Sequence, residues 1–332
     1  MPDTPPQISH DAAVDVVIAA WNRSETIERA VLSVAGEPEV RSVIVVDDAS
    51  TDDTADRVRR LAQDNQRINL IRMDRNGGPS IARNRALDVS TAPWVAILDG
   101  DDFMTPGRLG RLLARAEGWD FVADDLFQII EGEAFSPSAR SVLEVDETWP
   151  ERIELETFVL GNISRRGRGR REMGFLKPLM RRAFLDKHGL RYAPPVRLGE
   201  DYLLYAHALA ARARYRLMPA AGYVSVVRAA SLSGSHTRRD LEALLASDRT
   251  IAALPNLTAG ERYALRRHCR NLEGKIQWLV TIEAVKERSL GRFLGVFAAA
   301  PSVSLYVLGQ LLEQALIRST APVARLLGRS HV

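Results

Sequence analysis

The chain has 332 residues, of which 46% are hydrophobic and 26% charged, so it can bury a core and is not a disordered protein. Its 45 basic and 42 acidic residues leave a net charge of +3, which predicts no general affinity for nucleic acid. A single cysteine, Cys269, excludes an internal disulfide framework and indicates a reducing, cytoplasmic compartment. The proline-rich residues 1–13 predict a flexible N-terminus without the pattern of a signal peptide.

Strands and helices are predicted to alternate through the first half of the chain, because apolar runs are separated by typical helix-start signals. The expected strands are residues 14–19, 43–46, 69–73, 94–98 and 120–126. The expected helices begin at Asn22 or Ser24, at Ser50, at Pro79 and at Thr105-Pro106. Such alternation through short connections predicts an α/β fold with a doubly wound, mostly parallel, Rossmann-like sheet.

Polar residues follow three of the predicted strands, and the carboxyl ends of parallel strands are where such sheets bind ligands. These residues are Trp21-Asn22, Asp47-Asp48 and Asp99-Gly100-Asp101-Asp102. Carboxylates crowded at a strand end repel one another unless a cation lies between them. Mg²⁺ or Mn²⁺ suits oxygen ligands of this kind and shares its shell with substrate phosphates. The pattern therefore predicts a metal and phosphate site at this edge.

The sequence lacks the motifs of several other enzyme classes, and some of its acidic residues have a structural alternative. The sequence contains neither G-x-G-x-x-G after the first strand nor a P-loop motif nor G-x-S-x-G, which disfavours the corresponding enzyme classes. The six histidines show no paired metal-ligand spacing. Acidic strand ends can also cap helices, and we prefer that role for Asp52 and Asp53 and a functional one for Asp47 and Asp48.

The last third, residues 236–332, is predicted to be a helical C-terminal extension with helices at 241–254, 259–285 and 289–327. Residues 293–312 carry no charge and approach the length of a membrane span, but Pro301 and polar residues interrupt them. We expect an amphipathic hairpin that packs on the catalytic domain or lies on a membrane surface, in preference to a spanning helix. Flanking arginines suit anionic headgroups or a solvated helix face equally well. A glycine-spaced arginine cluster at residues 165–171 predicts a loop that is solvated or meets a diphosphate.

Five motifs occur in order along residues 14–230. They are Val17-Ile18-Ala19-Ala20-Trp21-Asn22, Val45-Val46-Asp47-Asp48-Ala49-Ser50-Thr51-Asp52, Asn76-Gly77-Gly78-Pro79-Ser80-Ile81-Ala82-Arg83-Asn84, Leu98-Asp99-Gly100-Asp101-Asp102 and Leu198-Gly199-Glu200-Asp201-Tyr202. Together they resemble the inverting family 2 glycosyltransferases of the GT-A fold, most similarly the bacterial succinoglycan-type glucosyltransferases. The resemblance implies a catalytic domain over residues 14–235, divided into a nucleotide-sugar half (14–126) and an acceptor half (127–235).

The resemblance also implies a donor site for a nucleotide sugar, with UDP-glucose expected. Its residues would be Ala19, Trp21, Asn22, Asp47, Asp48, Arg83, Asp99 and Asp102. Asp48 would accept the uracil imide N–H, Asp47 would orient the ribose or the first loop, and Arg83 would reach the diphosphate. The family usually has proline where Ala19 stands and tyrosine where Trp21 stands, so the packing around the base is expected to differ.

By the same resemblance, Asp101 and Asp99 would hold Mg²⁺ or Mn²⁺, which neutralises the departing diphosphate. Asp201 would be the general base for the acceptor hydroxyl, with Glu200 beside it, although a plain helix cap is the alternative for Asp201. The implied reaction moves a hexose onto a lipid-linked oligosaccharide in exopolysaccharide biosynthesis at the inner face of the plasma membrane. The resemblance also implies that the protein contacts a membrane peripherally and that it works with other polysaccharide-assembly proteins. A metal-dependent nucleotidyltransferase and a non-catalytic sugar-nucleotide-binding scaffold remain alternatives.

Overall fold

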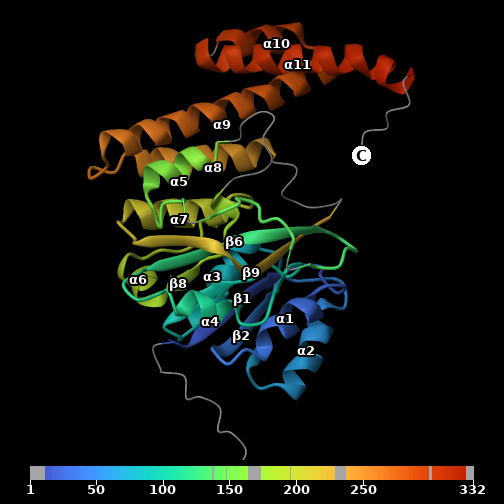
Figure 1. Ribbon diagram of the computed structural model, residues 1–332. Helices are drawn as coiled ribbons and strands as arrows, with labels where there is room; N and C mark the ends of the chain where they lie inside the picture. The colour runs from blue at the N-terminus through green and yellow to red at the C-terminus, as the bar shows by residue number, and fades with distance from the viewer. Residues whose placement is uncertain are drawn as a thin grey trace, which may run out of the picture. The chain divides into compact units, whose positions relative to one another are not determined.

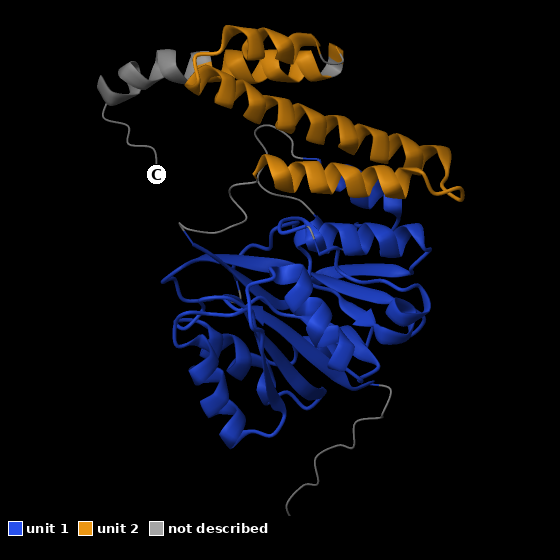
Figure 2. Ribbon diagram, turned by 180° about the vertical axis from the view of Figure 1, so that it is seen from behind, with its two compact units in different colours: residues 1–235 blue, residues 236–332 orange. Residues whose placement is uncertain are grey.

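The computed structural model describes residues 12–136, 138–146, 148–163, 173–194, 196–228, 237–298 and 301–326. The chain divides into two compact units, residues 1–235 and 236–332 (Figure 2). Most of the predicted N-terminal tail and the arginine cluster at 165–171 lie outside the described residues.

The first unit is built on one nine-stranded sheet (Figure 1). Its strands are β1 (Val14–Ala20), β2 (Val40–Asp47), β3 (Ile68–Arg72), β4 (Trp94–Ile97), β5 (Phe103–Met104), β6 (Phe121–Ile130), β7 (Arg152–Ile153), β8 (Leu179–Arg181) and β9 (Tyr215–Val227). The order is β3-β2-β1-β4-β8-β6-β9-β5, with β7 beside β9. The run from β3 to β4 and the β6–β9 pair are parallel, while β8 is antiparallel to both of its neighbours. The predicted mostly parallel α/β fold is confirmed.

The first strand explains why apolar runs in this region are unbroken. Val16, Val17 and Ile18 are fully buried although successive side chains point to opposite faces of the sheet. Both faces of β1 are therefore covered, as expected for the centre of a parallel sheet.

The helices of the first unit connect and cover these strands. They are α1 (Ile27–Ala35), α2 (Thr54–Asp64), α3 (Pro79–Val89), α4 (Arg108–Leu113), α5 (Leu155–Gly161), the 3₁₀ turn η2 (Met173–Phe175), α6 (Arg182–Lys187) and α7 (Glu200–Ala210). The expected start of α3 at Pro79 is confirmed, because proline lacks only an N–H that the first helical turn leaves unpaired.

The predicted helix starts at Asn22 or Ser24 and at Ser50 were wrong, because these residues join the loops after β1 and β2. The Ser50 hydroxyl accepts a hydrogen bond from the Asn22 amide at 2.9 Å, which joins the loops after β1 and β2. Asp53 occupies the N-cap position of α2 without a side-chain bond. Asp52 accepts from the Thr54 amide in the first turn of α2 (3.0 Å), which agrees with its expected capping role, and also from the Ser24 amide (3.1 Å). Burial opposes ionisation of Asp52, but a hydrogen bond from the Thr54 hydroxyl, together with these two amide bonds, lowers the pKa of Asp52 to about 2.

The second unit is helical. It contains α8 (Arg238–Ala252), α9 (Ala259–Lys286), α10 (Leu290–Gly295), the 3₁₀ turn η4 (Val296–Ala298) and α11 (Pro301–Leu326). Thr237 and Thr258 begin α8 and α9 with capping boxes. The helical segment expected over 289–327 is interrupted near Pro301, as predicted, because η4 and Pro301 separate α10 from α11.

Gly274 lets α9 and α11 approach closely, because a Cβ atom there would lie 2.8 Å from the Tyr306 ring.

Among the described residues, no helix is both long enough and apolar enough to cross a lipid bilayer.

Cys269 is expected to be unreactive in the folded chain. It is 8% exposed on α9, and burial, with the charges of Asp248 and Glu273, raises its pKa to about 12. Since the thiolate is the reacting form, labelling by Ellman's reagent at pH 8 should be roughly 1,000-fold slower than for a free thiol. Urea should restore the free-thiol rate, and rapid stoichiometric labelling of the native chain would contradict this prediction.

Candidate active site

The structure brings the polar strand ends together at one edge of the sheet. β1 lies between β2 and β4, parallel to both, so their carboxyl ends are neighbours. The Asp48 amide donates to the Ala20 carbonyl at 2.8 Å. Arg23, just after β1, forms an ion pair with Asp101, with Nε 3.2 Å from Oδ2. The loops after β1, β2 and β4 therefore form one continuous surface.

Asp48 organises the glycine loop after β3. Its two carboxylate oxygens accept the amides of Gly77 and Gly78 at 2.7 Å each, and its side chain is nearly buried. Gly78 has φ of +86°, a conformation that other residues adopt only under strain. Asp47 is fully buried, and its Oδ1 accepts from the Ser50 amide at 3.3 Å. The role of Asp48 as a reader of the base stays a prediction.

The first loop exposes an aromatic ring. Trp21 is 46% exposed, Ala19 is half-buried, and the Asn22 side chain accepts from the Thr51 amide at 2.9 Å. Asn22 and Ala49 have φ of +51° and +57°, the left-handed region that is costly for alanine. Backbone strain of this kind gathers at ligand sites, where the surroundings hold it in place.

A carboxylate–cation cluster lies beside this edge. It consists of Arg83, Asp99, Lys177, Glu200 and Asp201. The Arg83 guanidinium donates from Nη2 to Asp99 Oδ1 (2.7 Å) and from Nη1 to Glu200 Oε1 (2.6 Å) and Asp201 Oδ1 (3.3 Å). The Lys177 ammonium lies 2.9 Å from Asp99 Oδ2 and 2.5 Å from Asp201 Oδ2. Each cation thus contacts both Asp99 and Asp201, which are far apart in the sequence.

The charges of this cluster depend on one another. Burial acts to raise the pKa of Asp99, but Lys177 and Arg83 hold it well below its usual range. Burial acts to lower the pKa of Lys177, yet Asp201 and Asp99 raise it above its usual range. Burial raises the pKa of Glu200, despite the nearby Arg83 charge. The paired groups Asp99 and Lys177 therefore stay charged because they are together.

Helix α3 positions the acidic end of α7. The Ser80 hydroxyl donates to the Val196 carbonyl at 2.7 Å, and the side-chain Nδ2 of Asn84 donates to the Tyr192 carbonyl at 2.8 Å. Arg83 lies on the same face of α3 and has its guanidinium 5.2 Å from the centre of the Tyr192 ring. This face fixes the loop that leads into Glu200 and Asp201. The cap interpretation of Asp201 was wrong, because Gly199 occupies the N-cap position.

Arg83 and Asp102 are more enclosed than their predicted contacts with the donor require. Arg83 is 4% exposed and already binds three carboxylates, so direct contact with a diphosphate stays a prediction. Asp102 is buried and accepts from the Tyr223 hydroxyl and the Val226 amide, both at 2.8 Å. Burial and the charges of Asp99 and Asp101 raise the pKa of Asp102 to about 8. Asp102 therefore connects the loop after β4 to β9.

Of the acidic residues at this edge, only Asp101 is well placed to bind a metal ion. Across the described residues, no three histidine, cysteine or acidic side chains gather around a point that a metal could occupy. Both oxygens of Asp99 are already paired, whereas the Asp101 side chain is 25% exposed and pairs only with the partly exposed Arg23 among the described residues. Mg²⁺ commonly uses one or two carboxylates together with substrate phosphates. Asp101 fits that pattern as a single protein ligand, and Asp99 fits it less well.

Lys177 and Arg108 were missed by the sequence reasoning. Lys177 is one of four lysines among 45 basic residues and stands in the apolar run Phe175-Leu176-Lys177-Pro178, so its isolation was an available signal. Arg108 is 1% exposed, and its Nη2 donates to Asp124 Oδ1 at 2.5 Å and to the Lys177 carbonyl at 2.7 Å. No local pattern marks an arginine as buried.

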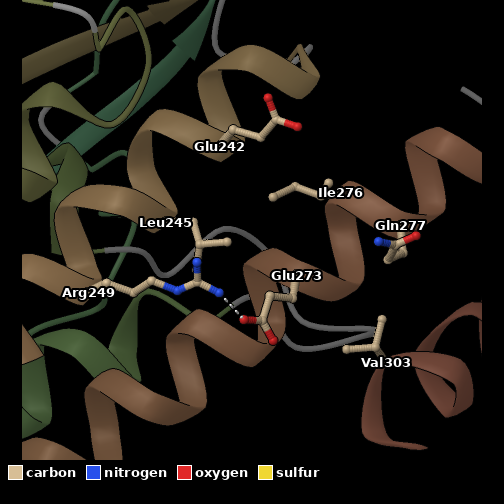
Figure 3. Close-up of a pocket in the computed structure, with 7 residues that line it drawn as sticks. All are labelled: Glu242, Leu245, Arg249, Glu273, Ile276, Gln277 and Val303. Carbon is tan, nitrogen blue, oxygen red and sulfur yellow. Dashed lines mark hydrogen bonds and ion pairs between the residues drawn. The ribbon is translucent and has the colours of Figure 1, made fainter. Parts of the chain in front are cut away.

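A separate cavity of about 350 Å³ lies in the second unit, between α8, α9 and α11 (Figure 3). Arg249 pairs with Glu273 across it at 2.7 Å, and Leu245, Ile276 and Val303 also line it. It contains none of the predicted site residues, all of which lie in the first unit.

Comparison with known proteins identifies the class of enzyme. Residues 15–184 match the family described as Glycosyl transferase family 2, and the chain belongs to that family. It is 44% identical to the succinoglycan biosynthesis protein ExoU of Rhizobium meliloti (strain 1021), over 94% of this chain and 92% of that protein. The family assignment favours glycosyl transfer over the nucleotidyltransferase alternative.

Two solved structures share the fold. The crystal structure of S. aureus TarS 1–349 in complex with UDP-GlcNAc aligns with a TM-score of 0.61 and 16% identity, over 86% of this chain and 90% of that one. The mannosyltransferase PcManGT from Pyrobaculum calidifontis, in complex with GDP-Man and Mn²⁺, aligns with a TM-score of 0.54 and 18% identity, over 90% and 79%. At these identities the likeness shows the fold alone.

Replacing Arg83 by methionine should destabilise the first unit. Arg83→Met leaves Glu200 without its cation and Asp99 and Asp201 with only Lys177, so we expect a loss of about 3 kcal/mol in the free energy of unfolding. The matched control is Arg85→Met, an exposed arginine on the same helix, which should change it by less than about 0.5 kcal/mol. Urea unfolding measures both, and equal effects would contradict the role given to Arg83.

Proposed function

We propose that this enzyme is an inverting, metal-dependent hexosyltransferase of exopolysaccharide biosynthesis, which moves glucose from UDP-glucose onto a lipid-linked oligosaccharide. The likeness to ExoU over nearly the whole of both chains supports a succinoglycan-type pathway. The observation that carries the proposal is the shared pairing of Asp99 and Asp201 with Arg83 and Lys177. It supports a single site in which the predicted donor loop and the predicted base act on one sugar.

In this mechanism Asp201 takes the proton from the acceptor hydroxyl as that oxygen attacks the anomeric carbon. A sugar hydroxyl is a weak nucleophile until its proton is removed in the transition state. A carboxylate oxygen has two lone pairs, so Asp201 keeps an acceptor position while each oxygen binds one cation. Direct in-line displacement then gives a β-linkage from an α-linked donor. Glu200, on the same helix turn, is proposed to face the acceptor.

The donor is proposed to lie along the loops after β1, β2 and β4. Trp21 offers an exposed aromatic face, and each Asp48 oxygen retains a lone pair beyond its bond to the glycine loop. A divalent ion would be held by Asp101, with Asp99 in support, and would neutralise charge on the leaving diphosphate. The Mn²⁺ in the PcManGT complex supports this choice of ion.

The second unit supports a location of the enzyme at a membrane surface, where a lipid-linked acceptor would lie. Exposed leucines line α10 and one side of α11, where Leu305, Leu308 and Leu312 lie opposite the buried Val303 and Val307. Residues 236–332 carry 14 basic and 8 acidic residues, whereas residues 1–235 are net acidic. An apolar stripe within a basic segment suits the surface of an anionic membrane. We therefore place the enzyme at the cytoplasmic face of the plasma membrane.

Asp201→Asn should remove transfer and leave donor binding intact. We expect transfer to fall roughly 100- to 10,000-fold, because the acceptor proton has no base. Melting temperatures with a panel of nucleotide sugars, with and without Mn²⁺, should still rise most for UDP-glucose with the metal present.

The matched control is Asp64→Asn, an exposed aspartate at the end of α2, which should transfer at the wild-type rate. Normal turnover by Asp201→Asn would remove the assigned base. A wild-type chain that binds UDP-glucose without transfer or metal-dependent hydrolysis would instead support the non-catalytic scaffold.

The membrane surface can be tested by adding charge to its leucines. The double variant Leu305→Glu/Leu312→Glu should bind phosphatidylglycerol-containing vesicles at least ~10-fold more weakly than the wild type in sedimentation assays, because charge opposes insertion. Leu32→Glu, at an exposed leucine of α1, is the matched control. Binding should also weaken with salt and be weaker to pure phosphatidylcholine. Equal loss in both variants, or no binding by the wild type, would contradict the proposal.

A further inference from the structure

Lys177 is buried in a way that lysine rarely is without a dedicated partner. Its side chain is 6% exposed, and its ammonium nitrogen lies within 3 Å of two carboxylates, Asp99 and Asp201. The residue lies two positions before β8, the strand that separates β4 from β6. The ammonium therefore reaches the end of β4 and the first turn of α7 from a third element.

The backbone of Lys177 is held as firmly as its side chain. Its carbonyl accepts from Arg108 Nη2 at 2.7 Å, and Arg108 is paired with the fully buried Asp124. Asp124 Oδ2 in turn accepts from the Ala221 amide at 2.9 Å, which connects this pair to β9. The flexible four-carbon stem of lysine is thus anchored at both ends, and its charge has a fixed position.

Arg83 does not make Lys177 redundant. Arg83 binds Oδ1 of both Asp99 and Asp201, while Lys177 binds Oδ2 of both. Arg83 contacts Asp201 at 3.3 Å and Glu200 at 2.6 Å, so its shorter bond goes to Glu200. Lys177 contacts Asp201 at 2.5 Å and is therefore the closer cation to the proposed base.

We propose that Lys177 is a positioning residue for glycosyl transfer, which orients the Asp201 carboxylate and fixes it relative to the donor loop at Asp99. This inference rests on the proposed function, since it concerns the same base. Without the ammonium, Asp99 and Asp201 would share only Arg83 and repel one another. A catalytic group displaced by about 1 Å commonly costs roughly 100-fold in rate. The donor loop keeps its remaining cation, so donor affinity should change little.

The test compares Lys177→Met, which preserves side-chain length, with Lys187→Met, an exposed lysine at the end of α6. We expect kcat of Lys177→Met to fall roughly 100-fold, with the donor KM and the calorimetric Kd for UDP within about threefold of wild type. Lys177→Arg should recover part of kcat, because it restores a cation. Lys187→Met should match the wild type in all three quantities.

If Lys177→Met folds poorly, a double variant that keeps the charge of the cluster balanced takes its place. Asp99→Asn/Lys177→Met removes one charge of each sign, so it should fold better than Lys177→Met. The proposal expects the double variant to have a lower kcat than Asp99→Asn, through Asp201 alone. Equal kcat in these two variants, or an unchanged kcat in folded Lys177→Met, would overturn it. Absence of transfer by the wild type with any donor would refute the proposed function instead.

Discussion

Buried negative charge is the constraint on which this site depends. Glu200 and Asp201 are buried at the start of α7, and the half-buried Asp99 reaches the same cations from the loop after β4. Such groups stay ionised only if cations are buried with them and hydrogen-bonded to them. Arg83 and Lys177 meet this need, and the surrounding structure is arranged to present them. The arrangement of charges at the sheet edge therefore requires that four parts of the chain fold together: α3, the loop after β4, the segment before β8 and the start of α7.

The motifs of the chain acquire distinct physical roles in this arrangement. Asp48 binds two successive amides of the glycine loop, while Asp47 binds the Ser50 amide in the loop after β2. One face of α3 carries Ser80, Arg83 and Asn84, which together hold the segment before α7. Only part of each motif faces the proposed ligand, and the remainder sets the position of that part.

The fold was largely predictable because its signals are local. Unbroken apolar runs marked β1, β2 and β4, and Pro79 marked the start of α3. Convergence of the strand ends followed from parallel topology alone. The helix starts at Asn22, Ser24 and Ser50 were misplaced, because the Asn22 amide and Ser50 hydroxyl bond one another across 28 positions.

The acidic residues of the site and Arg83 were predictable, but Lys177 was not. Asp99, Glu200 and Asp201 stand in recognisable motifs, whereas Lys177 follows a short 3₁₀ turn with no motif around it. The burial of Arg83 and Asp102 was also unforeseen, because solvent exposure depends on elements that pack from elsewhere, such as β9 for Asp102. Sequence patterns identified which residues carry charge, and tertiary packing decided which of them meet.

The cluster of Arg83, Asp99, Lys177, Glu200 and Asp201 also limits which segments of related enzymes can be recombined, in evolution or in the laboratory. Arg83 and Asp99 lie in the proposed nucleotide-sugar half, while Lys177, Glu200 and Asp201 lie in the proposed acceptor half. A chimera joined near residue 127 would combine cations and carboxylates from different parents. Recombinants should therefore be viable chiefly between parents whose charges at these five positions are complementary, which limits how freely acceptor specificity can be transplanted.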